Sequence, residues 1–145
     1  APTAAQPAPD ENAPTKVAEP PPDTQPASGT PKELMAMAKK KLRSGNPKGA
    51  EVIYRQVLSK TPSNLRARYG LAKALYASNR VAFARKELGR VLAIRGSHGG
   101  ALLMMGSILQ SQGKKPAARN YYKKYLDTHP NGRRADEIRS ILSRL

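Results

Sequence analysis

From residue 31 onward, apolar and small residues recur along the chain with a period of 34 residues. Within each period they lie three or four residues apart, the spacing that gathers side chains on one face of an α-helix. The sets in register are Ala50, Ala84 and Ala118; Tyr54, Leu88 and Tyr122; Val57, Val91 and Tyr125; Leu58, Leu92 and Leu126; Met37, Leu71 and Met105; and Ala38, Ala72 and Gly106. Each period therefore predicts two amphipathic helices, with small residues where the pair crosses closely.

The residues between these apolar stretches predict where the helices end and begin. One position of the period holds residues that tolerate the left-handed conformation after a helix, and another holds residues that cap a helix start. The first set is Gly45, Asn79 and Gly113, and the second is Ser63, Ser97 and Asn131. Pro47 and Pro116 stand early in second helices, where a missing amide costs little. These positions predict a tight turn within each pair and another turn between pairs.

Both ends of the array carry their own signals. Thr30, Pro31 and Glu33 form a capping-box sequence with proline at the first helical position, so the helices should begin at residue 31. Residues 133–145 predict one more helix with acidic residues in its first turn. Its apolar face carries Ile138, Ile141, Leu142 and Leu145. We interpret it as a cap on the open end of the array, and docking of a further domain or a second copy is the alternative.

This pattern resembles the tetratricopeptide repeat, a 34-residue helix-turn-helix unit with a small residue in its first helix, alanine and a large aromatic residue in its second, and proline near its end. The resemblance covers residues 31–64, 65–98 and 99–132, followed by the capping helix at 133–145. It implies an all-α fold, a right-handed superhelical solenoid of helix pairs. The departures are Arg68 at a place usually apolar, Lys41 at one usually aromatic, and Gly96 in place of proline.

Residues 1–30 differ in composition from everything that follows. They hold eight of the 13 prolines, four acidic residues and one basic residue, Lys16. No apolar face can be drawn on such a segment, so it cannot bury enough surface to offset chain entropy. We expect an acidic, disordered linker at 1–30 and one folded domain at 31–145. The chain starts at Ala1 without Met, which favours a piece of a longer protein in which the linker joins this domain to something upstream.

The charge of the chain is concentrated in the expected domain. Residues 31–145 hold 25 of the 26 Lys and Arg but only six of the ten acids, so the domain is close to +19. A surface of one sign repels itself and favours an acidic partner, whether protein, nucleic acid or anionic lipid. Charge that serves solubility alone is the alternative interpretation.

Three tyrosines stand among basic residues in the segment KKPAARNYYKKYLDTHP, residues 114–130. Nucleic-acid binding through base stacking would explain such a mixture. The period instead places Tyr122 and Tyr125 on the buried stripe of the last second helix, so we expect both rings in the core and Tyr121 as the exposed one.

The resemblance implies that the first helices of the units line a concave groove. We expect its binding residues to be Lys32, Lys39, Arg43, Arg66, Tyr69, Lys73 and Tyr76. The third unit would contribute Leu103, Ser107, Gln110 and Ser111, which make that end neutral. An extended acidic peptide would suit this groove, with its carboxylates on Lys and Arg and an apolar anchor on Tyr69 or Tyr76. A solvated basic face is the alternative, and the acidic residues of 1–30 could themselves mask the groove.

The second helices predict a second basic surface, on the convex side, with few acids to pair it. Its residues are Arg85, Lys86, Arg90, Arg119, Lys123 and Lys124, beside Arg55. Phosphate contacts from such rows would give salt-dependent binding to nucleic acid or an anionic membrane. We therefore predict an adaptor or scaffold module that binds an acidic peptide or protein, with polyanion binding by the convex face as the alternative.

The sequence gives no support for catalysis, a cofactor, a metal or a small-molecule substrate. It has no cysteine, and His98 and His129 both lie between units without a ligand at metal-binding spacing. The run GSHGG at residues 96–100 lacks the Lys-Ser/Thr that completes a phosphate loop. A cytoplasmic location is the expectation, with the periplasm as alternative for a processed or anchored fragment, and the oligomeric state stays open.

Overall fold

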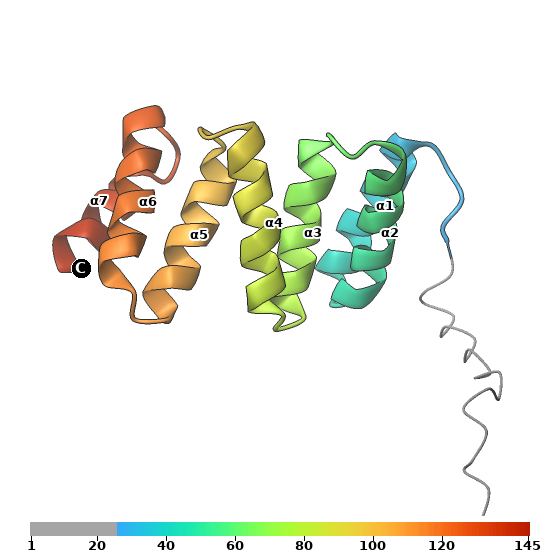
Figure 1. Ribbon diagram of the computed structural model, residues 1–145, viewed down its shortest axis with the longest axis horizontal. Coiled ribbons are helices and arrows are strands. Elements are labelled where there is room, and N and C mark those ends of the chain that lie inside the picture. Colours follow the sequence, from blue (N-terminus) through green and yellow to red (C-terminus); the bar gives the residue numbers. More distant parts are fainter. Residues whose placement is uncertain (1–25) are drawn as a thin grey trace, which may run out of the picture.

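Seven α-helices follow one another along residues 26–145, the part of the chain that the computed structural model describes, and no strand occurs there. They are α1 (Pro31–Arg43), α2 (Pro47–Lys60), α3 (Leu65–Ala77), α4 (Val81–Ile94), α5 (Gly99–Ser111), α6 (Lys115–Thr128) and α7 (Ala135–Arg144). Consecutive helices run antiparallel, and the pairs stack side by side in one elongated row (Figure 1). The predicted all-α array of helix pairs is therefore confirmed. The predicted linker, except for residues 26–30, lies outside the described residues.

The turn inside each pair is built in the same way three times. Gly45, Asn79 and Gly113 have φ of 80°, 60° and 72°, the left-handed conformation that the sequence predicted. In the first turn the amide of Gly45 donates to the carbonyl of Leu42 and the amide of Asn46 to that of Lys41, which is the Schellman arrangement. Equivalent bonds close the other two turns.

The helix starts agree with the sequence at α1 and differ by one residue later on. Thr30 accepts a hydrogen bond from the Glu33 amide, and Glu33 accepts one from the Thr30 amide at 2.7 Å, so the predicted capping box is confirmed. The predicted caps Ser63 and Ser97 are wrong. Their neighbours cap α3 and α5 instead, because the side chains of Asn64 and His98 accept from the third amide of each helix. The predicted cap Asn131 also fails, since α7 begins only at Ala135 without a side-chain cap.

Buried apolar residues form two clusters along the row. One joins α1, α2 and α3 with Ala84 of α4, and the other joins α4, α5, α6 and α7 with part of α3. Tyr122 and Tyr125 are 2% and 5% exposed, which confirms them as core, and Tyr121 is only partly buried. Met37 is 39% exposed although its partners in register, Leu71 and Met105, are buried, because within residues 26–145 no helix covers that side of α1.

Two buried glutamates tie neighbouring helices together. Glu87 of α4 pairs with Arg68 of α3 at 3.0 Å and with Arg90, so an ion pair fills the position of Arg68 that is usually apolar. Glu51 of α2 pairs with Arg55 and, at 2.8 Å, with Arg80 at the start of α4. The sequence predicted few acids to pair the basic residues of the second helices, and the structure shows that Arg55 and Arg90 are among those that are paired.

The segment before α1 is attached to the array. The amide of Ala27 donates to the Gln56 side chain at 3.0 Å, and the carbonyl of Ala27 accepts from it at 2.6 Å. Ala27 also packs against the first core cluster. These contacts place residue 27 on α2, three residues before the capping box.

Candidate functional site

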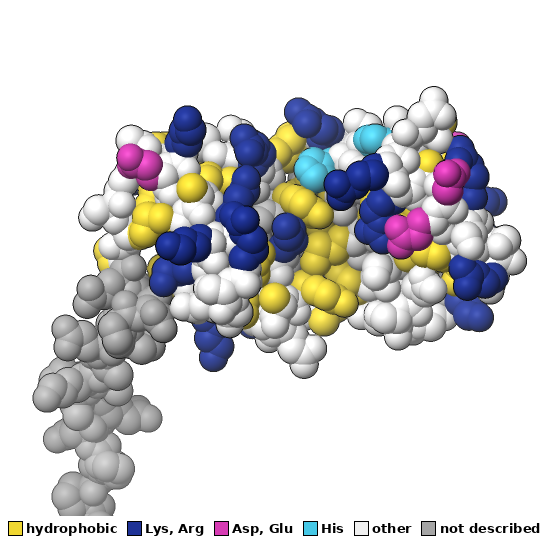
Figure 2. Space-filling model, turned by 180° about the vertical axis from the view of Figure 1, so that it is seen from behind, with side chains coloured by type: hydrophobic (Ala, Val, Ile, Leu, Met, Phe, Trp, Pro, Cys, Tyr) yellow, Lys and Arg dark blue, Asp and Glu magenta, His cyan; other side chains and the backbone are white. Residues whose placement is uncertain are grey.

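Three adjoining cavities run along the face formed by α1, α3, α5 and α7. The first two share Leu42, Tyr69 and Lys73, and the second and third share Lys39, Arg43 and Arg66, so they form one continuous groove. All seven residues predicted for the groove line it, namely Lys32, Lys39, Arg43, Arg66, Tyr69, Lys73 and Tyr76. Figure 2 shows Lys and Arg side chains gathered in a column beside a hollow lined by hydrophobic side chains.

The half of the groove between α1 and α3 is basic. Lys32, Lys39, Arg43 and Arg66 line its outer cavity of about 420 Å³, and no acidic residue of the described part of the chain lines that cavity or the next one. Among residues 26–145, no carboxylate lies within ion-pair distance of any of these four side chains. Their charges therefore face the groove without a counter-ion from the folded domain.

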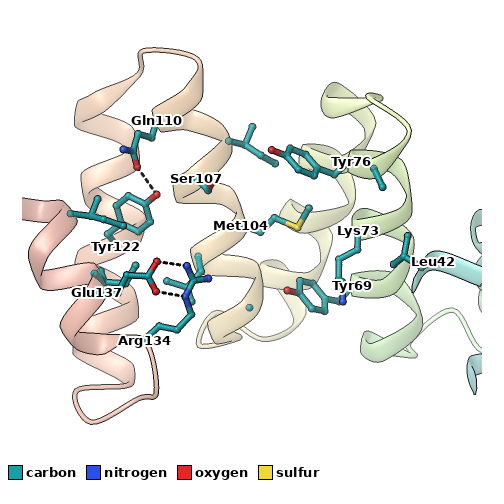
Figure 3. Close-up of a pocket in the computed structure, with 16 residues that line it drawn as sticks. Leu42, Tyr69, Lys73, Tyr76, Met104, Ser107, Gln110, Tyr122, Arg134 and Glu137 are labelled. Atoms are coloured by element: carbon teal, nitrogen blue, oxygen red, sulfur yellow. Dashed lines mark hydrogen bonds and ion pairs between the residues drawn. The ribbon is translucent and has the colours of Figure 1, made fainter. Parts of the chain in front are cut away.

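The other half of the groove is an apolar basin of about 720 Å³ (Figure 3). Tyr69, Lys73 and Tyr76 reach into it from α3, and Met104, Ser107 and Gln110 line it from α5. Leu103, Ile108, Ile138 and Ile141 complete the apolar lining. The sequence predicted a neutral end here but missed Met104 and the contribution of α7, and Ser111 does not line the cavity. The available signal was the apolar face of the last helix, which the sequence assigns to a cap or, alternatively, to docking of a further domain or a second copy.

Polar contacts mark the far wall of the basin. The Tyr122 hydroxyl donates to Gln110 Oε1 at 2.8 Å, and burial raises the pKa of Tyr122. Arg134 donates two hydrogen bonds to Glu137, both at 2.7 Å. These bonds lower the pKa of the Glu137 carboxyl and raise that of the Arg134 guanidinium. Sequence reasoning assigned no role to Arg134, because nothing in the pattern brings the turn before α7 to the groove.

Tyr69 stands at the junction between the basic half and the basin, and it is held from several sides. Its ring lies 4.8 Å from the ring of His98, and Lys73 Nζ lies 5.7 Å from its centre. Gly100 makes room for it, since a Cβ at that position would lie 2.7 Å from the Tyr69 hydroxyl. Burial raises the pKa of Tyr69 and lowers that of His98. His98 therefore stays neutral at pH 7 and keeps Nδ1 free to cap α5.

Comparison with known families decides what kind of array this is. Models described as tetratricopeptide repeat match residues 41–97 and 100–132, together more than half of the chain. The chain belongs to the tetratricopeptide repeat family. A search of curated proteins found no significant match.

Solved tetratricopeptide structures share the fold at low sequence identity. The type III secretion translocator chaperone SycD of Yersinia enterocolitica, in an alternative dimer, has a TM-score of 0.71 at 15% identity, covering 81% of this chain and 89% of that one. The first tetratricopeptide domain of human RPAP3 has a TM-score of 0.69 at 22% identity, covering 78% and 90%. The first such repeat domain of Spaghetti (RPAP3), solved with the HSP90 peptide SRMEEVD, has a TM-score of 0.70 at 22% identity, covering 82% and 95%.

The second helices of the tetratricopeptide array carry the residues predicted for a polyanion face. Lys86 on α4 and Lys123 and Lys124 on α6 are exposed, whereas Arg85 and Arg119 are partly buried. Arg85 contacts Gln112, and Arg90 is paired with Glu87. Of these six residues, Arg90 on α4 is therefore the one with an acidic partner among the described residues.

Two further classes of site can be tested on the described residues. No helix within 26–145 has the length and apolar character needed to cross a membrane. The same residues contain no cluster of three or more His, Cys, Asp or Glu side chains that could hold a metal. The groove is therefore the site on which we base a function.

Proposed function

We propose that this tetratricopeptide domain is a non-catalytic interaction module that binds an acidic, extended peptide segment of a partner protein in its groove. The observation that carries the proposal is the lining of the basic half, where four cationic side chains face the groove and no acid of the folded domain, residues 31–145, balances them. Hydrogen bonds between such groups and ligand carboxylates are short, charge-assisted and directional. An acidic segment would supply the missing counter-charges.

The apolar basin supports a more specific ligand. A cavity of about 720 Å³ accepts one or two large side chains, and its walls offer Tyr76, Met104 and Ile141. A peptide that joins an apolar anchor to a run of acids would fill the basin and cover the basic half together. One structural neighbour was solved with a peptide, SRMEEVD, in which methionine precedes acidic residues.

The proposal is tested by binding of a fluorescein-labelled decapeptide, one leucine among Asp and Glu, to the full chain. Lys39→Glu with Lys73→Glu should weaken binding about tenfold or more, because two favourable charge contacts become repulsive. Lys86→Glu with Lys123→Glu changes the net charge equally on α4 and α6 and serves as the matched control.

Three outcomes are informative. Loss of binding in the groove pair alone supports the groove. Equal loss in both pairs would show that net charge, and not the groove, attracts the peptide. Loss confined to the control pair would favour polyanion binding by the convex face. Helicity and melting temperature of each variant must match those of the wild type.

A further inference from the structure

One ion pair lies among the side chains that line the groove. Arg134, in the turn before α7, donates through Nε and Nη2 to the two carboxylate oxygens of Glu137, at 2.7 Å each (Figure 3). Both residues line the apolar basin. Among residues 26–145, Glu137 is the only acidic residue that lines any of the three cavities. The groove thus already holds one carboxylate, and it comes from the domain itself.

The geometry of this pair is that of an arginine with a ligand. Two parallel N–H donors meeting both oxygens of a carboxylate is the arrangement by which arginine recognises Asp, Glu and terminal carboxylates. The side chains are 49% and 52% exposed, and pairs of this exposure contribute little to folding stability. Glu137 can therefore leave Arg134 by a side-chain rotation without disturbing α7.

The surroundings define what could replace Glu137. Arg134 lines the same cavity as the apolar residues Ile138, Ile141 and Met104, and the cationic side chain of Lys73 lines this cavity from α3. A ligand that brings a carboxylate to Arg134 can therefore also bury an apolar side chain in the basin. The basic half offers its own cations without any internal carboxylate, so only this end contains a competitor.

We propose that Arg134 is a carboxylate-binding residue of the groove and that Glu137 occupies it in the free domain, to be displaced when a ligand places an apolar side chain in the basin with a carboxylate next to it. This inference rests on the proposed function and adds a specificity-determining residue to it. This exchange makes binding selective, because a ligand without that carboxylate cannot replace Glu137 and gains no contact with Arg134.

The structure supplies a matched control for the test. Asp136 stands next to Glu137 in the first turn of α7, is fully exposed, lines no part of the groove and pairs with Arg139. Asp136→Asn and Glu137→Gln remove the same charge from the same helix turn. A difference between them therefore reports on the contact with Arg134 and not on net charge or on the helix dipole.

The experiment measures binding of the labelled decapeptide to full-length wild type, Glu137→Gln, Asp136→Asn, Arg134→Gln and the Arg134→Gln, Glu137→Gln double variant. We expect Glu137→Gln to bind about three- to tenfold more tightly and Asp136→Asn to bind as the wild type does. Arg134→Gln should bind more weakly. The double variant should match Arg134→Gln, because the gain from removing Glu137 requires a free arginine.

The inference is overturned if Glu137→Gln tightens binding equally with and without Arg134, since the effect is then general electrostatics. It is also overturned if both Arg134→Gln and Glu137→Gln bind as the wild type while the Lys39→Glu, Lys73→Glu pair loses binding, and in that case the proposed function survives alone. If the decapeptide binds no variant and not the wild type, both proposals fail.

Discussion

His98 shows how one side chain can position two parts of the molecule. Its Nδ1 accepts the Ala101 amide at 3.1 Å and so caps α5, while its ring packs on Tyr69 at the centre of the groove. The cap requires the neutral imidazole, because a protonated Nδ1 cannot accept a hydrogen bond. Burial, together with the nearby charges of Arg95 and His129, lowers the pKa of His98 and keeps the ring neutral.

This depressed pKa predicts a loss of stability on mild acidification. In the unfolded chain His98 takes up a proton near its ordinary pKa of 6.5, whereas in the fold it does so only at lower pH. The unfolded state then binds more protons, so the free energy of unfolding should fall as the pH drops below about 6.5. His98→Asn keeps a capping side chain without the titration. Urea denaturation between pH 7.5 and 5.5 should show a larger loss for the wild type, and parallel curves would contradict the assignment.

Two glycines in helix interiors should respond to alanine in opposite directions. A Cβ at Gly106 would lie 2.6 Å from the ring of Tyr122, which is buried, so Gly106→Ala should destabilise the fold by about 1–3 kcal/mol. Gly89 is exposed on α4 with no atom within 4 Å of the added Cβ, so Gly89→Ala should stabilise it by about 0.5–1 kcal/mol. Urea denaturation of both variants measures these changes in the free energy of unfolding. A stabilising Gly106→Ala would show that Tyr122 is not held in place.

At the scale of elements, a buried ion pair between Arg68 and Glu87 links α3 to α4. Glu87→Gln should destabilise the domain by about 2 kcal/mol, since it leaves Arg68, whose side chain is 15% exposed, without its counter-charge. Adding Arg68→Leu, which restores the apolar residue usual at this place, should recover most of that loss. Chemical denaturation of the single and double variants measures the recovery. A double variant no more stable than Glu87→Gln would mean that Arg68 is needed for other contacts, such as its bond to the Pro62 carbonyl.

Substitutions on the two faces of α7 should have different effects, one mainly on stability and the other mainly on binding. Ile138 is 1% exposed and completes the core, so Ile138→Ala should cost about 2–5 kcal/mol in the free energy of unfolding. Ile141 is partly buried and lines the basin, so Ile141→Ala should cost less stability but weaken binding of the labelled decapeptide. Denaturation and fluorescence anisotropy on both variants test this division. Equal effects of the two substitutions on binding would argue against a separate groove-facing side.

The elements also show which features a sequence can predict. The 34-residue period predicts the helix pairs, because buried positions must recur wherever equivalent helices pack. Every binding residue predicted for the groove lines it in the structure. The caps of α3 and α5 were missed by one residue. Ser63 caps a helix about as well as Asn64, and Ser97 is by type a better cap than His98, so only the backbone geometry selects Asn64 and His98. Arg134 was missed because its place depends on how the turn before α7 bends, which no periodic signal encodes.

At the scale of the whole molecule, the positions of the six acids of residues 31–145 determine which cations have a counter-charge. Five are engaged in structure: Glu33 in the capping box, Glu51 and Glu87 in buried pairs, and Asp136 and Glu137 on α7. Most acids of the folded domain are thus used within its own helices, and the cations of the basic half of the groove are left unbalanced by the described residues. Arg134 in the basin and the buried Arg68 are cations that do have an acidic partner.

This arrangement predicts opposite effects of salt on folding and on binding. Screening weakens the self-repulsion of a domain close to +19, so the melting temperature should rise between 50 and 500 mM NaCl, values about threefold apart in screening length. Binding of the labelled decapeptide should weaken over the same range. Thermal melts and anisotropy titrations measure the two trends. A melting temperature that falls with salt would show that the ion pairs outweigh the repulsion.

The attachment of Ala27 to Gln56 has a mechanical consequence. A pull along the backbone at residue 26 would load these two hydrogen bonds on α2 before it reached the capping box of α1. Gln56 lines no part of the groove. A load applied at residue 26 would therefore be transferred to α2, on the side of the second helices, and not directly to the residues that line the groove.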